Sequence, residues 1–192
     1  MESYYSIDTA KSDAASNYLD TDQVKNYLKV EYDITAENTL IEALIKAAES
    51  YFEEFTNRAL NDHSLFIRLW EISADGIYVN IELPYKGTYS SVVVKTVYED
   101  TETTLTENTD YYITSNRIRL SKTVFTDIEN TELLITADVT AVFTDPNIEP
   151  ALYKLIADMY EQRSNDSIEG LQRISYTTRS LLMPFRDVST MI

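Results

Sequence analysis

The hydrophobic pattern of this chain changes its period twice, and this change constrains the fold more than any other feature of the sequence. From residue 35 to residue 60, apolar residues recur every three or four positions, the spacing of an amphipathic helix. Between residues 64 and 143 they alternate, as in strands with one buried face, and the helical spacing returns between residues 150 and 163. The sequence therefore predicts an α+β fold: a helical core, made of a long helix plus C-terminal helices, packed with an inserted antiparallel β-rich region.

The long helix is predicted over residues 35–60, with Thr35 as its N-cap. Its buried face is expected to hold Leu40, Leu44, Ala47, Ala48, Tyr51, Phe52 and Phe55. The charged residues that fall largely on other faces, and are expected in solvent, are Glu42, Lys46, Glu49, Glu53 and Glu54. Because Glu53 and Glu54 point about 100° apart on the helix, a solvated face is favoured over a metal-binding pair.

Two further helices are predicted, one on each side of this pattern. The first covers residues 20–30, where Asp20 is a capping residue followed three positions later by Gln23. The second covers residues 150–163 and has Pro150 in its first turn, where a missing N–H leaves no hydrogen bond unmade. Its apolar stripe, expected to pack on the long helix, is Leu152, Leu155, Ile156, Met159 and Tyr160.

The middle of the chain is predicted to form six strands. They cover residues 66–70, 77–83, 91–98, 111–114, 117–120 and 133–143. Ser115 and Asn116 are expected to make a tight hairpin turn. No helical pattern separates the strands, so the sheet should be mainly antiparallel. The acid-rich segment from Glu99 to Asp110 lacks the glycine and terminal glutamate of a calcium-binding loop, which favours an acidic hairpin or loop.

These patterns divide the chain into three parts. Residues 1–19 show no convincing period and are interpreted as a flexible N-terminal arm. Residues 20–163 contain the helices at 20–30, 35–60 and 150–163 and the β region at 64–143, which together should form one core. Residues 164–192 follow as a C-terminal docking tail.

The composition argues against most catalytic sites. The chain has no cysteine, which removes disulfides, thiolate metal sites and a cysteine nucleophile, and only three glycines, which makes a phosphate-binding loop unlikely. His63 is the only histidine, and no Gly-x-Ser-x-Gly turn accompanies it, so a solvated loop histidine is the favoured interpretation. No signal peptide or membrane span is expected.

The charge of the chain is strongly negative and unevenly distributed. Of a formal net charge of −16, residues 1–62 carry −8, residues 63–149 carry −8 and residues 150–192 carry none. In residues 170–192, Asp187 alone opposes three arginines, so this end is locally basic. An acidic body of this kind repels nucleic acid, because DNA-binding affinity comes mainly from neutralising phosphates. The basic end suits docking to another protein.

In the order of its predicted elements, the chain resembles the phage head-tail connector proteins, also called adaptor or head-completion proteins. The resemblance covers most of the chain and rests on the order of these pieces: Val24 to Leu28, Leu40 to Leu60, Leu83-Pro84 before the strand at 92–98, Asp110 to Ile113, the last strand, Ile148 to Arg163, and Leu181 to Arg186. Two features depart from the family. Many members end the last strand in Ala-Gly-Tyr, where this chain has Ala141-Val142-Phe143, and the arm and acidic middle are longer than usual.

The resemblance implies a structural virion protein without catalysis, cofactor or membrane. Such a protein assembles in the host cytoplasm into a homo-oligomeric ring, commonly of twelve subunits, beneath the portal in the neck of the virion. The portal lies on one side of the ring, and tail, stopper or tail-completion proteins lie on the other. DNA passes through the channel without sequence-specific binding, and acidic walls would let it slide.

The docking tail is the predicted partner-binding site. Residues 170–192 are expected to become ordered against the portal. The residues expected to make this contact are Arg173, Arg179, Leu182, Pro184, Phe185 and Arg186. The alternatives left open are another neck or tail-completion protein, a small acidic hydrolase, and a DNA mimic that occupies a DNA-binding host protein.

Overall fold

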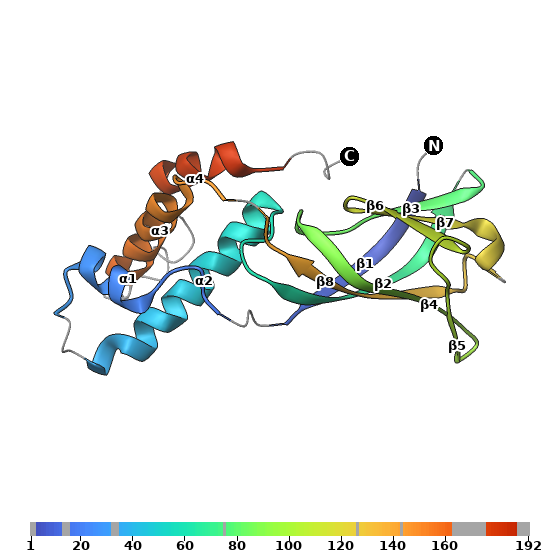
Figure 1. Ribbon diagram of the computed structural model, residues 1–192, viewed down its shortest axis with the longest axis horizontal. Coiled ribbons are helices and arrows are strands. Elements are labelled where there is room, and N and C mark those ends of the chain that lie inside the picture. The colour runs from blue at the N-terminus through green and yellow to red at the C-terminus, as the bar shows by residue number, and fades with distance from the viewer. Residues whose placement is uncertain are drawn as a thin grey trace. The chain divides into compact units, whose positions relative to one another are not determined.

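The chain divides into two compact units, each with its own core. The computed structural model describes residues 3–12, 16–31, 35–74, 76–125, 127–142, 144–162 and 176–187 (Figure 1). The β unit comprises residues 1–15 and 62–142, and the helical unit comprises residues 16–61 and 143–192. The sequence predicted one core over residues 20–163, whereas the structure has two units. Residues 3–12, predicted to lie in a separate arm, belong to the β unit.

The helical unit contains all the α-helices of the described residues. These are α1 (Thr21–Leu28), α2 (Asn38–Thr56), α3 (Ile148–Gln162) and α4 (Tyr176–Leu182), with short 3-10 helices η1 (Thr35–Glu37) and η4 (Met183–Phe185). Asp20 caps α1 as predicted, since its side chain accepts a 2.7 Å hydrogen bond from the backbone N–H of Asp22. Within the described residues, no helix is both long and apolar enough to cross a membrane.

The buried face of α2 differs from the predicted one. Its fully buried apolar residues are Ile41, Ile45, Ala48 and Phe52, whereas Leu44, Tyr51 and Phe55 are only partly buried. Thr35 starts the 3-10 helix η1, and Glu37 occupies the N-cap of α2 without a capping side-chain hydrogen bond. The C-terminal end is also earlier than predicted, because Asn57 adopts a left-handed conformation (φ 53°) that stops the helix.

The core of the helical unit joins α2 to α3 and to the C-terminal helices. Leu152, Leu155 and Ile156 of the predicted α3 stripe are fully buried there. The other buried members of this cluster are Leu19, Val24, Ile41, Ile45, Ala48, Phe52, Leu60, Ile148, Ala151, Leu182 and Phe185. The prediction that the 150–163 helix packs in one core with the long helix is therefore confirmed.

The β unit consists of two antiparallel sheets. The larger sheet has the strand order β1-β2-β8-β4-β5, and the smaller has the order β3-β7-β6. The strands are β1 (Ser3–Lys11), β2 (His63–Ala74), β3 (Tyr78–Glu82), β4 (Thr88–Tyr98), β5 (Thr101–Thr104), β6 (Tyr111–Thr114), β7 (Arg117–Ser121) and β8 (Glu132–Thr140). All six predicted strands are present, and Ser115-Asn116 forms the predicted hairpin turn between β6 and β7.

The two sheets bury their apolar residues between them. The fully buried positions alternate along the strands and include Leu65, Leu69, Val79, Ile81, Ile118, Leu120 and Leu133. The hydroxyl of Tyr111 in β6 donates a 3.1 Å hydrogen bond to the carbonyl of Val92 in β4, which ties the smaller sheet to the larger. Each sheet therefore has an outer face made of the intervening side chains.

Strand β1 replaces most of the predicted flexible arm. It pairs with β2 from Ser3↔Ala74 to Lys11↔Leu65, and the N–H of Ser12 donates to the carbonyl of Ser64 at 2.9 Å. This strand lacks a clear hydrophobic period because β1 lies at the edge of the sheet, where polar side chains are tolerated. His63 is also not a solvated loop residue: it starts β2, is buried, and its Nδ1 lies 3.1 Å from the carbonyl oxygen of Ser12.

Candidate docking surfaces

The predicted docking residues lie partly inside the helical unit. Leu182 is fully buried and Phe185 is only 6% exposed, so in this conformation both are core residues. Arg179 and Pro184 are exposed, and Arg186 is half-buried. Arg173 lies outside the described residues. We call residues 176–187 the C-terminal clasp, since one side of this segment is fixed to the helical unit and the other is open.

One end of the clasp is fixed to the C-terminal end of α2. The Phe185 ring packs against Phe52, with ring centroids 5.8 Å apart, and its backbone carbonyl accepts a 2.7 Å hydrogen bond from Nε of Arg58. The N–H of Asp187 donates to the carbonyl of Thr56 at 2.8 Å. Thr56 is in the last turn of α2, where carbonyls lack helical partners, so the clasp caps this helix.

The other end of the clasp is fixed to α3 through Asp158. Its carboxylate accepts a 2.5 Å hydrogen bond from Oγ1 of Thr178 and a 2.6 Å hydrogen bond from Nζ of Lys154. The hydrogen bond to Asp158 raises the pKa of Lys154, which keeps the ammonium charged. Asp158 and Thr178 are both buried, so this contact orients α4.

The open side of the clasp is apolar and basic. Leu181 is 43% exposed and Met183 is 50% exposed, and Arg179 and Pro184 lie beside them in the sequence. We call these four residues the clasp surface. The sequence prediction chose Leu182 instead of Leu181 and omitted Met183. Only the phase of the short helix α4, which turns Leu182 inward, distinguishes the neighbouring leucines.

Two buried carboxylates of α2 fix the chain where it enters and leaves the helical unit. Oε1 of Glu49 accepts hydrogen bonds from the N–H groups of Tyr18 (2.9 Å) and Leu19 (3.0 Å). Oε1 of Glu53 accepts from the N–H groups of Leu60 (2.8 Å) and Asn61 (3.1 Å). Both glutamates are at most 3% exposed, so the expected solvated positions were wrong for them.

Glu49 also holds a side chain, in addition to the two backbone N–H groups. Oε2 of Glu49 accepts a 2.7 Å hydrogen bond from Nδ2 of Asn61, so one carboxylate joins segments on both sides of α2. Burial raises the pKa of Glu49, while these hydrogen bonds oppose that shift. The described residues contain no group of three histidine, aspartate or glutamate side chains that could hold a metal ion.

The outer face of the larger sheet is a second candidate docking surface. Phe66 is 54% exposed and lies in one row across the strands with Ala10, Thr136 and Val93, of which Val93 is also exposed. Ion pairs flank this row: Arg68 with Glu132 (2.7 Å) and Lys95 with Glu102 (2.9 Å). An exposed apolar row bordered by charges is typical of a protein-binding surface.

Comparison with known protein families identifies a match over more than half of the chain. The family model described as phage gp6-like head-tail connector protein matches residues 18–129. The matched segment contains α1, α2 and the strands from β2 to β7. None of the curated protein sequences compared with the chain matches it.

Solved structures share the fold over nearly the whole chain. A chain from the virion of a native gene transfer agent (GTA) particle matches with a TM-score of 0.64 and 15% identity, over 94% of this chain and 96% of the other. A chain from the neck of an empty GTA particle, computed with C6 symmetry, gives 0.60 and 18%, over 94% and 97%. One from the neck of a native GTA particle, computed with C12 symmetry, gives 0.56 and 17%, over 92% and 95%.

Proposed function

The chain belongs to the phage gp6-like head-tail connector family, and on this premise we propose that it is a structural neck protein that forms a homo-oligomeric ring beneath a portal. The family match over residues 18–129 is the observation that carries the proposal. The similar structures support it, since two are described as necks of GTA particles. The proposed role is one of connecting head to tail, with no catalytic step.

The proposed ring contains twelve copies of the chain. Symmetries of C6 and C12 were used for the similar neck structures, and both are compatible with twelve subunits around one axis. The formal net charge of −16 supports a position around a DNA channel, because an acidic wall repels phosphates and gives the duplex no place to bind. We place the protein in the virion, after assembly in the host cytoplasm.

The portal is proposed to bind the clasp surface. Arg179, Leu181, Met183 and Pro184 present apolar area together with a positive charge, and Leu182 and Phe185 fix this surface to the helical core. The burial of Phe185 supports a role in holding this surface rather than in direct contact. The outer face of the larger sheet, around Phe66, is the surface proposed to contact tail or stopper proteins.

Electron microscopy of the purified chain mixed with portal protein tests the proposal. We expect a ring of density in register with the portal, and no such ring with a tail-terminating protein alone. Leu181→Ser together with Met183→Ser should weaken this binding, whereas Ile77→Ser, at an exposed apolar residue of the β unit, should not. Portal particles without added density would overturn the proposal. Deletion of the whole tail is a poor test, because it removes core residues.

A further inference from the structure

The outer face of the smaller sheet carries two arginines close together, although the chain as a whole is acidic. In register across its strands, Arg119 of β7 lies between Tyr112 of β6 and Asn80 of β3. In the next row, Arg117 lies between Thr114 and Glu82. We call the outward-facing residues Tyr78, Asn80, Tyr112, Arg117 and Arg119 the Arg–Tyr face.

The arginines of this face are held in place. The guanidinium carbon of Arg119 lies 3.8 Å from the centroid of the Tyr78 ring, a cation–π contact that helps to hold the side chain. Arg119 forms no ion pair with a carboxylate of the described residues. Arg117 pairs with Glu82 but its side chain remains 55% exposed. Arginine and tyrosine are both enriched among the residues that contribute most to binding at protein interfaces, and here Arg119 lies beside the exposed Tyr112.

A turn of opposite charge, which we call the acidic turn, connects β4 and β5. Tyr98 pairs with Thr101, so Glu99 and Asp100 are the two central residues of a tight hairpin, and both are exposed. Both have positive φ, 45° and 62°, in a turn that usually contains asparagine and glycine. Glu102 follows in β5 and is exposed. The negative charge of Glu99 raises the pKa of the Tyr98 hydroxyl, as expected near concentrated charge.

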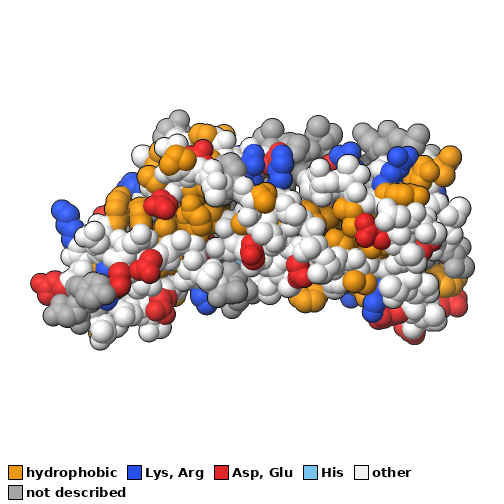
Figure 2. All heavy atoms as spheres, viewed as in Figure 1, with side chains coloured by type: hydrophobic (Ala, Val, Ile, Leu, Met, Phe, Trp, Pro, Cys, Tyr) orange, Lys and Arg blue, Asp and Glu red, His pale blue; other side chains and the backbone are white. Residues whose placement is uncertain are grey.

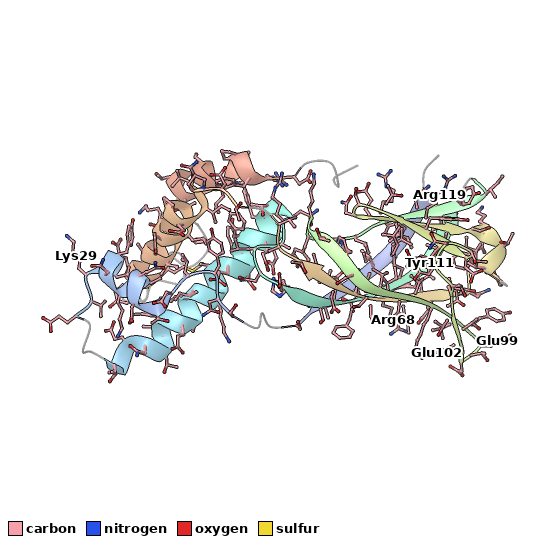
Figure 3. All side chains as sticks on the ribbon, in the orientation of Figure 1. Lys29, Arg68, Glu99, Glu102, Tyr111 and Arg119 are labelled. Carbon is pink, nitrogen blue, oxygen red and sulfur yellow. The ribbon has the colours of Figure 1, made fainter. Side chains whose placement is uncertain are left out.

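These two features lie on opposite sides of the β unit. Figure 3 shows Arg119 at the upper edge of this unit and Glu99 and Glu102 at its lower edge. In the space-filling view, Lys and Arg side chains gather at the corresponding upper edge, and Asp and Glu side chains at the lower one (Figure 2). A single copy therefore cannot bring its own Arg–Tyr face and acidic turn together.

We infer that the Arg–Tyr face of one copy binds the acidic turn of a second copy of this chain. The contact is head to tail: each copy uses one surface toward one neighbour and the other surface toward the next. Contacts of this heterologous kind generate closed rings when the rotation between copies closes. The inference rests on the ring proposed above and names the surfaces that would build it.

The charges favour a second copy over nucleic acid as the occupant. The Arg–Tyr face has two arginines and includes Glu82 in its rows, whereas DNA affinity needs several phosphate contacts without nearby acids. Glu99 and Asp100 supply two carboxylates at the tip of a short hairpin, which match the two guanidinium groups in number and sign, while Glu102 pairs with Lys95 of its own copy.

Charge reversal tests the contact. Arg119→Glu alone and Glu99→Arg alone should each raise the concentration needed for ring assembly on the portal about tenfold or more, since like charges then face each other. The chain that carries both substitutions should assemble like the unchanged protein. Lys46→Glu, a reversal at an exposed residue of α2 in the helical unit, is the matched control and should leave the ring intact. Intact rings with either single reversal would overturn the inference while leaving the proposed function standing.

Disulfide trapping tests the same contact without the portal. The chain has no cysteine, so Tyr112→Cys, beside Arg119, and Asp100→Cys, beside Glu99, introduce the one pair that can oxidise. A ladder of covalent oligomers is expected from the chain with both substitutions, and none from Asp100→Cys combined with Asp8→Cys. Absence of the ladder would overturn the inference even if no ring forms with the portal. Loss of DNA binding on Arg119→Glu, with assembly unchanged, would assign the face to nucleic acid instead.

Discussion

Several charged side chains of the helical unit are buried, whereas those of the ion pairs in the β unit lie on its outer faces. Lys25, Glu49, Glu53 and Asp158 are all buried in the helical unit, while the charged residues of the β-unit ion pairs are exposed or half-buried. The reason is connectivity. The helical unit fixes the chain segments that flank its apolar core through a few buried polar contacts, and the β unit joins its strands through continuous backbone ladders.

The contrast between buried carboxylates and backbone ladders predicts where single substitutions should act most strongly. A ladder spreads its hydrogen bonds over many residues, so no one side chain is essential to it. A buried carboxylate that accepts two backbone N–H groups concentrates the same task in one residue. Trp70, the only tryptophan, lies in β2, so its fluorescence reports on the β unit. Far-UV circular dichroism at the helical minimum reports on the helical unit, since the described helices lie there.

Phe185→Ala should have the largest effect on the stability of the helical unit. Removing a buried ring from the helical core should lower the free energy of unfolding by about 3 to 5 kcal/mol. Urea unfolding followed by circular dichroism should show this loss, with a smaller change in the Trp70 transition. Met183→Ala, on the exposed side of the same clasp, is the control and should change stability by less than about 0.5 kcal/mol. Equal effects of the two substitutions would contradict the fixed clasp.

Glu53→Ala should come next in size. It leaves the N–H groups of Leu60 and Asn61 without their acceptor, which should cost about 2 to 4 kcal/mol in the helical transition. Glu54→Ala, one residue along on the exposed side of α2, should stay within about 0.5 kcal/mol of the unchanged protein. If the two substitutions have the same effect, Glu53 does not hold the 60–61 segment.

The contribution of Glu49 to the pH dependence of stability should be a smaller effect than that of Glu53→Ala. Its sign should be opposite to that of an ordinary surface glutamate. Burial raises its pKa in the folded state above the unfolded value, so between these two values the folded chain binds more protons. Stability of the helical unit should therefore gain from acidification within this window and fall as the pH rises through it. Glu53, which also raises this pKa, and the hydrogen bonds from Tyr18, Leu19 and Asn61, which lower it, set the size of the effect.

Glu49→Gln isolates that contribution. Glutamine keeps an oxygen acceptor for the N–H groups of Tyr18 and Leu19 but does not titrate. The difference in unfolding free energy between the unchanged protein and Glu49→Gln should decrease as the pH rises from 4.5, when both are measured by urea unfolding. A difference that stays constant over this range would show that Glu49 keeps its ordinary pKa.

Arg68→Ala should have the smallest effect. Its ion pair with Glu132 lies on an exposed sheet face, where such pairs contribute about 0.2 to 1 kcal/mol and weaken in salt. The Trp70 transition should shift by no more than this, and added salt should remove the shift. A larger loss would mean that side-chain contacts, rather than the backbone ladder, hold β2 against β8.

The same contrast explains which parts of the fold could be predicted from the sequence. Alternating residues such as Leu65, Ile67 and Leu69 made the strands of the β unit recognisable, because a two-residue period has one physical meaning. In α2, Glu49 and Glu53 occupy core positions, which shifted the predicted apolar face away from Ile41 and Ile45. Their hydrogen bonds to residues 18–19 and 60–61 are tertiary contacts that no local pattern contains.

The candidate sites, too, could be predicted only in part from the sequence. The hydrophobic period predicted the fold class, resemblance to the connector family identified the family, and the charge distribution located the basic tail. Which of Leu181 and Leu182 faces outward depends on the contact of Thr178 with Asp158, which sets the phase of α4. The Arg–Tyr face was missed because Arg117 and Arg119 become neighbours of Tyr78 only through the pairing of β3 with β7.

Because the clasp is part of the helical core, partner binding and the stability of the helical unit are thermodynamically linked. A partner that binds the clasp surface while the clasp is docked stabilises the helical unit by mass action, and its melting temperature must rise with partner concentration. A partner that instead captures Phe185 must first detach the clasp, so it would expose the end of α2 and lower that temperature. The sign of the thermal shift therefore distinguishes a rigid adaptor from one that opens on engagement.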